Sequence, residues 1–218
     1  MCLIGVIYAS VIAFRQTNIK RLIAFSSMAH ISLMAAAMFA VNYYSTQGLL
    51  FQVISHGVTI VALFYMVHLI QERTSTLDLS QMGGLKLAAP NMAILLLIII
   101  LGSIALPLTS GFVGEFLIIM GLAKLSVWFA AFGGTTMILG AIYMLYAYQR
   151  IMLGDKNPAL VKVKDIRTLD YFILIPLIAA IIILGIYPQP ILNLVEVSVN
   201  SMQKLFLPAN EMVNLFVR

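Results

Sequence analysis

Uninterrupted apolar runs constrain the fold of this chain more than any other feature of its sequence. The run ILLLIIILGSI, residues 94–104, contains no ionisable side chain. A helix of about 20 such residues spans the roughly 30 Å apolar core of a bilayer. Charged residues make up only 10% of the sequence, against about 25% in soluble domains. Five stretches are therefore predicted to span a membrane: residues 22–41, 48–70, 91–119, 126–149 and 171–187.

The two ends of the chain depart from this pattern. Residues 1–14 are apolar, but as a helix they reach only about 21 Å, so we expect them to be the end of a helix that begins elsewhere. Residues 191–218 have helical amphipathicity without the apolar length to span, and Pro208 divides them. The predicted fold class is all-α: a polytopic membrane helix bundle of about six transmembrane segments, residues 1–190, with one segment broken at Pro107. An amphipathic tail, residues 191–218, is predicted to lie on the outer side.

Lysine and arginine are distributed unequally between alternate loops, and this predicts the orientation. Inner loops of membrane proteins retain these residues. The loops after the first, third and fifth segments are therefore expected to face the cytoplasm or its equivalent. The formal net charge of +5 is assigned to these loops, and no nucleic-acid partner is expected. The inner residues are Arg15, Lys20, Arg21, Arg73, Lys86, Arg150, Lys156, Lys162, Lys164 and Arg167, and the outer residues are Lys124, Lys204 and Arg218.

Polar side chains inside three consecutive apolar segments are the candidate functional residues. Polar groups in bilayer helices are rare and usually face protein or water. Ser26 and Ser27 share a helix face with His30, and Gln52, His56 and Thr59 share another. Glu115 lies in the following segment. Histidine titrates near neutrality, so it can release a proton as well as bind one.

The segment that carries Glu115 is predicted to be discontinuous. As one straight helix, residues 91–119 would be about 43 Å long, well beyond the apolar core. Pro107 removes a backbone donor and clashes with the preceding turn, and Gly111 and Gly114 add backbone freedom. A second half-helix is expected to begin near Ser110, with Glu115 in its early turns. Discontinuous helices of this kind mark ion sites in transporters.

Structural roles are the alternatives for these residues. A single intramembrane histidine can form a packing hydrogen bond between helices. The proline can be a kink used for packing, with Glu115 paired to a lysine. His68, beside Glu72 and Arg73, is interpreted as an interfacial residue. A single cysteine, Cys2, excludes a cysteine-rich metal or iron–sulfur site, and no metal-ligand spacing is present in the sequence.

Five motifs in order resemble a known family. They are RQTNIKRLIAFSSMAHISLM (residues 15–34), QVISHGVTIVALF (52–64), MGGL (82–85), GFVGEFLI (111–118) and GIYPQPIL (185–192). The chain resembles the C-terminal portion, roughly the last six of fourteen transmembrane helices, of the M-type or chain 4 antiporter-like membrane subunits of NADH–quinone oxidoreductase, respiratory complex I. The wider family includes Mrp-type cation/proton antiporters. The family often has Pro-Gly-Thr where this chain has Pro107, Leu108 and Thr109.

The resemblance implies roles for individual residues. His30, His56 and Glu115 match the family's mid-membrane proton relay, with Glu115 as the terminal carrier on the broken helix. Supporting roles fall to Lys20, Ser27, Gln52, Thr59, Pro107 and Thr109.

The function implied is proton translocation coupled to electron transfer from NADH to a quinone. No cofactor, metal or redox centre is expected in this chain; flavin, iron–sulfur clusters and the quinone site would lie in partner subunits. Expected partners are other membrane-arm subunits, including neighbouring antiporter-like subunits, the N-terminal half as part of the same subunit or a separate chain, and lipid. The expected location is a bacterial or mitochondrial inner membrane. The alternatives are an Mrp-type antiporter component, or a truncated subunit retained for structure or assembly.

Overall fold

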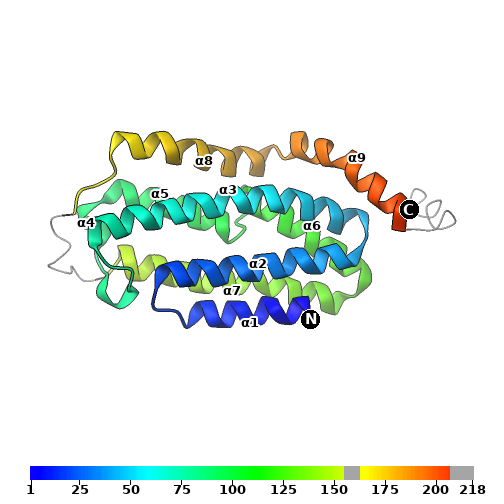
Figure 1. Cartoon of the computed structure of the whole chain (residues 1–218), viewed down its shortest axis with the longest axis horizontal. Helices are drawn as coiled ribbons and strands as arrows, with labels where there is room; N and C mark the ends of the chain where they lie inside the picture. The colour runs from blue at the N-terminus through cyan, green and yellow to red at the C-terminus, as the bar shows by residue number, and fades with distance from the viewer. Residues whose placement is uncertain (155–162, 207–218) are drawn as a thin grey trace.

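A computed structural model describes residues 1–154 and 163–206, and within these ranges the chain is a bundle of helices (Figure 1). An isolated bridge between Asn18 and Asp78 joins two loops of the same end. The helices in chain order are α1 (Cys2–Phe14), α2 (Ile19–Ala40), α3 (Tyr43–Thr74), η1 (Leu79–Gln81), α4 (Leu85–Ala88), α5 (Pro90–Ser103), α6 (Ser110–Leu125), α7 (Val127–Met152), α8 (Thr168–Ile186) and α9 (Gln189–Phe206).

The predicted membrane segments are confirmed as helices. Among the described residues, α2, α3, α7 and α8 are each long and apolar enough to cross a bilayer, and α1 and α5 are shorter apolar helices. The helix α3 extends beyond its apolar run because Asn42 caps its start, accepting a hydrogen bond from the Ser45 backbone N–H. Asn18 caps α2 in the same way, accepting from Lys20 and Arg21.

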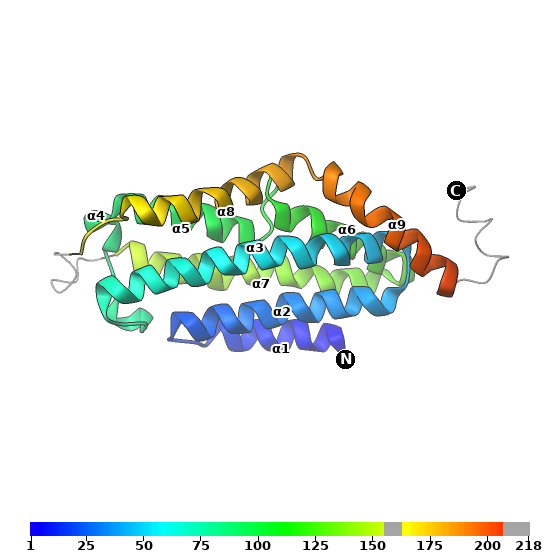
Figure 2. The same ribbon diagram turned by 45° about the horizontal axis from the view of Figure 1, so that its top comes forward.

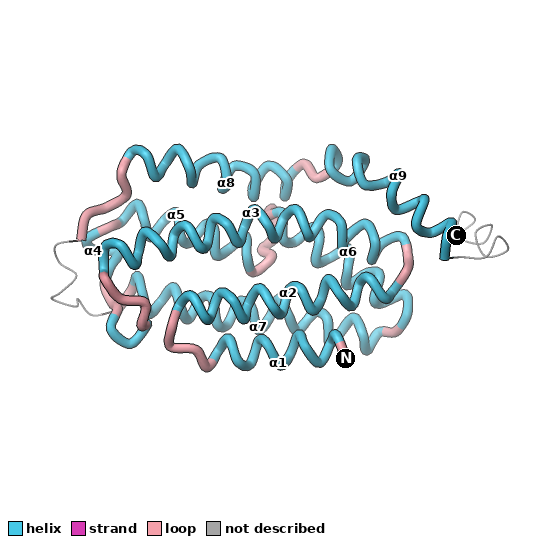
Figure 3. The backbone as a smooth tube through the Cα atoms, in the orientation of Figure 1, coloured by secondary structure: helices cyan, strands magenta, loops and turns pink. Residues whose placement is uncertain are grey.

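The segment with Pro107 is broken, as predicted, but the break begins earlier than expected. The helix α5 ends at Ser103 and α6 begins at Ser110. A proline ring clashes with the carbonyl four residues before it, which here belongs to Ser103. Ala105 and Leu108 then adopt positive φ angles of 55° and 76°. Figure 3 shows the break as a short loop in the middle of the bundle.

The loops lie at the two ends as the charge distribution predicts. The α1–α2 and α3–α5 connections share one end with the last turn of α7 and the start of α8, and the described residues of α9 lie at the other end (Figures 1 and 2). At the inner end, Asp165 accepts hydrogen bonds from the backbone N–H groups of Asn91 and Met92, both at 3.0 Å. This carboxylate caps α5, whose own N-cap residue supplies no side chain for the purpose.

The helix α8 lies along one edge of the bundle and exposes most of its apolar residues, as expected from its sequence (Figure 1). Only Asp170, Leu174, Ile178 and Ile181 of α8 are buried. An ion pair of 2.8 Å between Arg73 and Asp170 attaches its first turn to α3. The amphipathic α9 packs on α3 through Val195 and Val199, while the predicted contact of the tail with a neighbouring subunit stays a prediction. Pro208, Lys156 and Lys162 lie outside the described residues.

Glycines allow α3 and α6, the most closely associated pair of helices, to approach each other. A Cβ atom added to Gly48 would lie 2.7 Å from the Ile118 backbone nitrogen, and one on Gly121 would lie 2.5 Å from the Ser45 nitrogen. Gly114 leaves room in the same way for the side chain of Gln52. These contacts set the distance between α3, which carries Gln52, and α6, which carries Glu115.

The interior consists of two apolar clusters with a polar layer between them. The larger cluster includes Ile23 on α2 and Leu63 on α3, and the smaller includes Leu33 and Ile118. On α2, His30 falls between Ile23 and Leu33 in the chain. The polar side chains are therefore held at mid-bundle by apolar packing on both sides.

Replacing Gly48 with alanine is expected to destabilise the protein, because the new methyl group meets backbone atoms that cannot rotate away. We expect a loss of about 1–3 kcal/mol, seen as a lower unfolding temperature in detergent. Gly57→Ala on the same helix is the matched control, because a Cβ there meets nothing within 4 Å. Equal destabilisation by both substitutions would contradict glycine-dependent packing of α3 on α6.

Candidate functional site

The centre of the polar layer is a contact between α2 and α6. The Nδ1 atom of His30 lies 2.7 Å from Oε1 of Glu115. Both residues are buried, with exposed fractions of 3% and 0%. The distance is that of an ion pair, although the geometry is not that of a directed hydrogen bond. An isolated buried carboxylate is costly, so this imidazole is the group placed to balance the charge of Glu115.

Gln52 brings a third helix, α3, to the same carboxyl group. Its Nε2 atom donates to Oε1 of Glu115 at 3.3 Å. Within the described part of the chain, the other carboxyl oxygen of Glu115, Oε2, has no hydrogen-bond partner, nor has Oε1 of Gln52. One oxygen of Glu115 is thus held by two neighbours, and the other has a free lone pair that can take a proton.

His56 extends the site from the buried pair toward the surface of the chain. Its ring centroid lies 5.2 Å from that of His30. The Nε2 atom of His56 lies 2.8 Å from the Ser27 hydroxyl. His56 is partly buried, whereas His30 is fully buried. The three candidate residues Glu115, His30 and His56 therefore form a continuous row of contacts, and Ser27 contacts the His56 end of it.

Some supporting residues predicted from sequence are not brought to this row. The Thr59 hydroxyl donates to the Ser55 carbonyl of its own helix at 2.9 Å. Lys20 donates to Gln71 at 2.6 Å at the inner end, about 15 Å along α2 from His30. Thr109 closes the turn of the break by donating to the Leu106 carbonyl at 2.6 Å, and Pro107 is exposed.

Other buried hydroxyls near the row were not predicted from the sequence. Ser55 on α3 donates to Ser110 at the start of α6, with 2.7 Å between the oxygens, and both residues are buried. The Tyr143 hydroxyl on α7 lies 3.0 Å from that of Ser26. A helical signal exists for Ser55, which is three residues from Gln52 and four from Thr59. Tyr143 lies on the same face of α7 as Thr136, seven residues earlier.

The arrangement is suited to holding and passing protons. Imidazole can bind a proton on one nitrogen and release one from the other, and the carboxyl group of Glu115 is a second exchangeable site. Because these groups lie in direct contact, a charge on one acts on its neighbour. Among residues 1–154 and 163–206, no cluster of three or more histidine, cysteine, aspartate or glutamate side chains could hold a metal ion.

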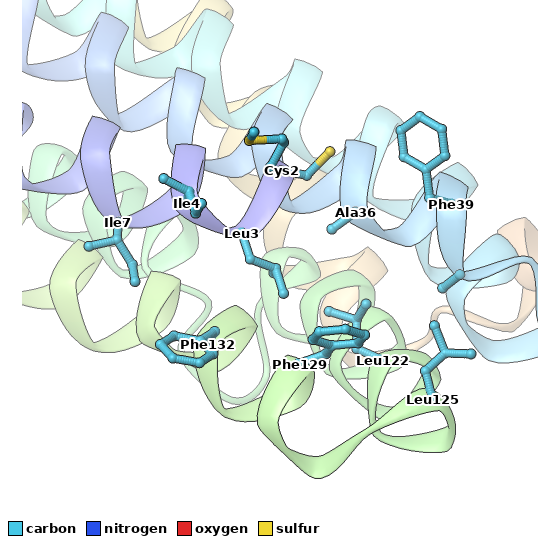
Figure 4. Close-up of a pocket in the computed structure, with 12 residues that line it drawn as sticks. Cys2, Leu3, Ile4, Ile7, Ala36, Phe39, Leu122, Leu125, Phe129 and Phe132 are labelled. Carbon is cyan, nitrogen blue, oxygen red and sulfur yellow. The ribbon is translucent and has the colours of Figure 1, made fainter.

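An apolar hollow at the outer end of the bundle is separate from this site (Figure 4). Its volume is about 590 Å³, and it lies between the start of α1, the end of α2 and the α6–α7 turn. Ile7, Phe39 and Phe129 are among its lining residues, and the thiol of Cys2 is the one ionisable side chain in its lining. The hollow is therefore mostly apolar and is not part of the row of Glu115, His30 and His56.

Comparison with known proteins shows similarity to one family along most of the chain. Residues 1–142 match the family described as the transmembrane region of NADH:quinone oxidoreductase and the Mrp antiporter. NADH-quinone oxidoreductase subunit M of Rickettsia felis is 37% identical over 203 residues, 93% of this chain. NADH-ubiquinone oxidoreductase chain 4 of Arabidopsis thaliana is 34% identical over 200 residues, 91% of this chain. The chain spans 41% and 40% of the length of these two relatives.

Solved structures show the same fold. A chain of respiratory complex I from Thermus thermophilus superposes with a TM-score of 0.89 and 28% identity, covering 95% of this chain and 44% of that one. A chain of the Mrp complex from Dietzia sp. DQ12-45-1b superposes with a TM-score of 0.86 over 94% of this chain and 46% of that one. At 16% identity, the second similarity concerns the fold alone.

The Ser55–Ser110 contact is expected to stabilise the start of α6. Ser110→Ala leaves the buried Ser55 hydroxyl without its partner, which costs about 1–3 kcal/mol. Replacing both serines with alanine should cost less than the sum of the two single losses, because neither partner is then left unpaired. Unfolding temperatures of the single and double variants measure this coupling. Strictly additive losses would mean that the two hydroxyls do not interact.

Proposed function

This chain belongs to the membrane-subunit family shared by NADH:quinone oxidoreductases and Mrp antiporters, and from that premise we propose that it translocates protons in the membrane arm of an NADH:quinone oxidoreductase. The chain is an integral membrane protein, and the proposed location is a bacterial or mitochondrial inner membrane. The observation that carries the proposal is the buried contact of Glu115 with His30, continued to His56 by the contact between the two imidazole rings.

In the proposed cycle, Glu115 is loaded with a proton on Oε2, its oxygen without a hydrogen-bond partner. While Glu115 is ionised, the imidazolium form of His30 balances its charge at 2.7 Å. Protonation of Glu115 removes that balance and favours release of the His30 proton toward His56. Two positive charges 5.2 Å apart repel by about 3 kcal/mol at an effective dielectric of about 20. Simultaneous charging of both histidines is therefore disfavoured, and the proton moves along the row.

The helix break supplies the conditions for this exchange. In a continuous helix the backbone N–H and C=O groups are paired with one another. A break leaves some of these backbone groups without a partner in the helix at mid-membrane. Because α6 begins at Ser110, the break places Glu115 in the second turn of this half-helix, beside His30 and Gln52.

Redox chemistry belongs to partner subunits in this proposal. They would hold the flavin, the iron–sulfur clusters and the quinone site, and changes of charge there would drive the row electrostatically. The remainder of the length seen in relatives would supply the other half of the pathway, in the same subunit or as a separate chain. Neighbouring antiporter-like subunits would pack along the bundle.

A cation/proton antiporter component of the Mrp type is the second candidate. The superposition on the Mrp complex chain favours it, because this fold serves both classes. Proton movement that depends on sodium and not on NADH oxidation would identify the antiporter. A structural or assembly role is the third candidate, and normal pumping by variants of Glu115 would identify it.

Glu115→Gln tests the proposal, because glutamine keeps the shape of the side chain and removes its ionisation. The complex is expected to assemble, with NADH-driven proton uptake into sealed vesicles falling on the order of 10²-fold per assembled complex. Glu115→Asp should retain part of the activity, because it keeps the acid with a shorter reach.

Glu72→Gln is the matched control. Glu72 is an exposed carboxylate at the inner end, paired with Arg167 and remote from the row. We expect it to pump at the parental rate. Parental pumping by Glu115→Gln would make Glu115 a structural residue and overturn the proposed function.

A further inference from the structure

A buried tyrosine on α7 has no role in the row described above. Tyr143 is one of the largest fully buried side chains, with 1% of its surface exposed. Phenylalanine would fill the same space without a polar group to satisfy. Burying a hydroxyl is unfavourable unless it is hydrogen-bonded, so the environment of the Tyr143 hydroxyl indicates what it does.

The Tyr143 hydroxyl joins two other buried hydroxyls on different helices. It lies 3.0 Å from the hydroxyl of Ser26 on α2, and either oxygen can donate. Ser10 on α1 supplies a second hydroxyl beside it, and Ser10 itself donates to the Val6 carbonyl at 2.7 Å. Ser26 and Ser10 are 3% and 1% exposed. Three hydroxyls from α1, α2 and α7 thus meet where these helices pack together at the lower side of Figure 1.

This group of hydroxyls adjoins the proton-binding row. Ser26 is one turn before His30 on the same face of α2. The helix α7, which carries Tyr143, also packs on α6, which carries Glu115. On the other side, the group reaches the seam between α1 and α7.

We infer that Tyr143, Ser26 and Ser10 form a hydroxyl branch that carries protons between the His30–Glu115 pair and the α1–α7 seam. A proton released by the His30–Glu115 pair is taken up on a lone pair of the Ser26 oxygen, whose own O–H bond breaks as its proton passes to Tyr143. Tyr143 passes its proton to Ser10 in the same way, and Ser10 gives up its proton to a water molecule admitted at the α1–α7 seam. After one passage all three hydroxyls are neutral again, so neither an oxidant nor a permanent charge on Tyr143 is required. The inference rests on the proposed function, because the branch has a role only if the row moves protons.

The alternative is that the Ser26–Tyr143 hydrogen bond only ties α2 to α7. A purely structural hydrogen bond between these helices affects stability and assembly, but it does not affect the transfer of protons in complexes that have assembled. The two roles are therefore separated by measuring NADH-driven proton uptake per assembled complex, together with its solvent deuterium isotope effect.

Tyr143→Phe in the assembled complex is the principal test, because it removes only the hydroxyl. Proton uptake per complex is expected to fall about tenfold, equivalent to about 1.4 kcal/mol in the transfer barrier, with a changed isotope effect. Tyr148→Phe on the same helix is the matched control and should pump at the parental rate, since Tyr148 lies outside the branch. Ser26→Ala should reproduce the defect, and Ser26→Thr, which keeps a hydroxyl, should restore most of the rate.

The double variant Tyr143→Phe/Ser26→Ala should be no slower than the slower single variant if both act in one branch. Reduced assembly with parental pumping per complex in Tyr143→Phe and Ser26→Ala would overturn the branch and leave a structural tie. If Tyr143→Phe pumps at the parental rate while Glu115→Gln does not pump, the hydroxyl branch is overturned and the proposed function stands. Parental pumping by Glu115→Gln would overturn the proposed function itself.

Discussion

The backbone groups released at the break between α5 and α6 are costly at mid-membrane, and the surrounding elements are arranged to cover them. No water is present in the bilayer core to satisfy free N–H and C=O groups, so irregular backbone survives there only inside protein. Gly185 of α8 packs directly on the backbone of Leu108 and Thr109, and a Cβ at that position would collide with it. The Thr109 hydroxyl closes the turn. The predominantly apolar α8 therefore covers the backbone at Leu108 and Thr109, while the side chains of residues 106–108 are exposed.

The start of the second half-helix is tied to α3, and this tie brings the chemistry together. Ser55 bonds Ser110, the first residue of α6, and Gln52 bonds Glu115 five residues later. Gly48, Gly114 and Gly121 permit the close approach on which both hydrogen bonds depend. The close contact of α3 with α6 therefore has two effects: it excludes lipid from the interface, and it sets the surroundings of the Glu115 carboxyl group.

Charged pairs at the inner end and in the middle of the bundle serve different purposes. At the inner end, the ion pair of Arg73 and Asp170 joins α3 to α8, and the Asp165 carboxylate caps α5. The arginine in that pair keeps its positive charge at all physiological pH values. At mid-membrane the group that faces the carboxyl group is a histidine, a residue type that can give up its proton. A pair whose two charges disappear when one proton passes from the imidazolium to the carboxylate is a poor permanent link and a good proton carrier, which agrees with the proposed role of Glu115, His30 and His56.

The sequence by itself determined the membrane segments, the grouping of the loops, the break, and which residues, His30, His56 and Glu115, are candidates. Each of these depends on local properties: apolar length, loop charge, the missing N–H of Pro107, and helical spacing. The tertiary structure alone decided which groups meet. Ser27 bonds His56 on another helix, Lys20 and Thr59 find partners away from the row, and Asp165 caps a helix 74 residues earlier in the chain. Spacing fixes the face of a helix on which a side chain lies, but its partner depends on how neighbouring helices rotate and approach. Here the distance between α3 and α6 is set by contacts such as that of Gly48 with the backbone of Ile118. The spacing of residue types along the sequence does not reveal such contacts.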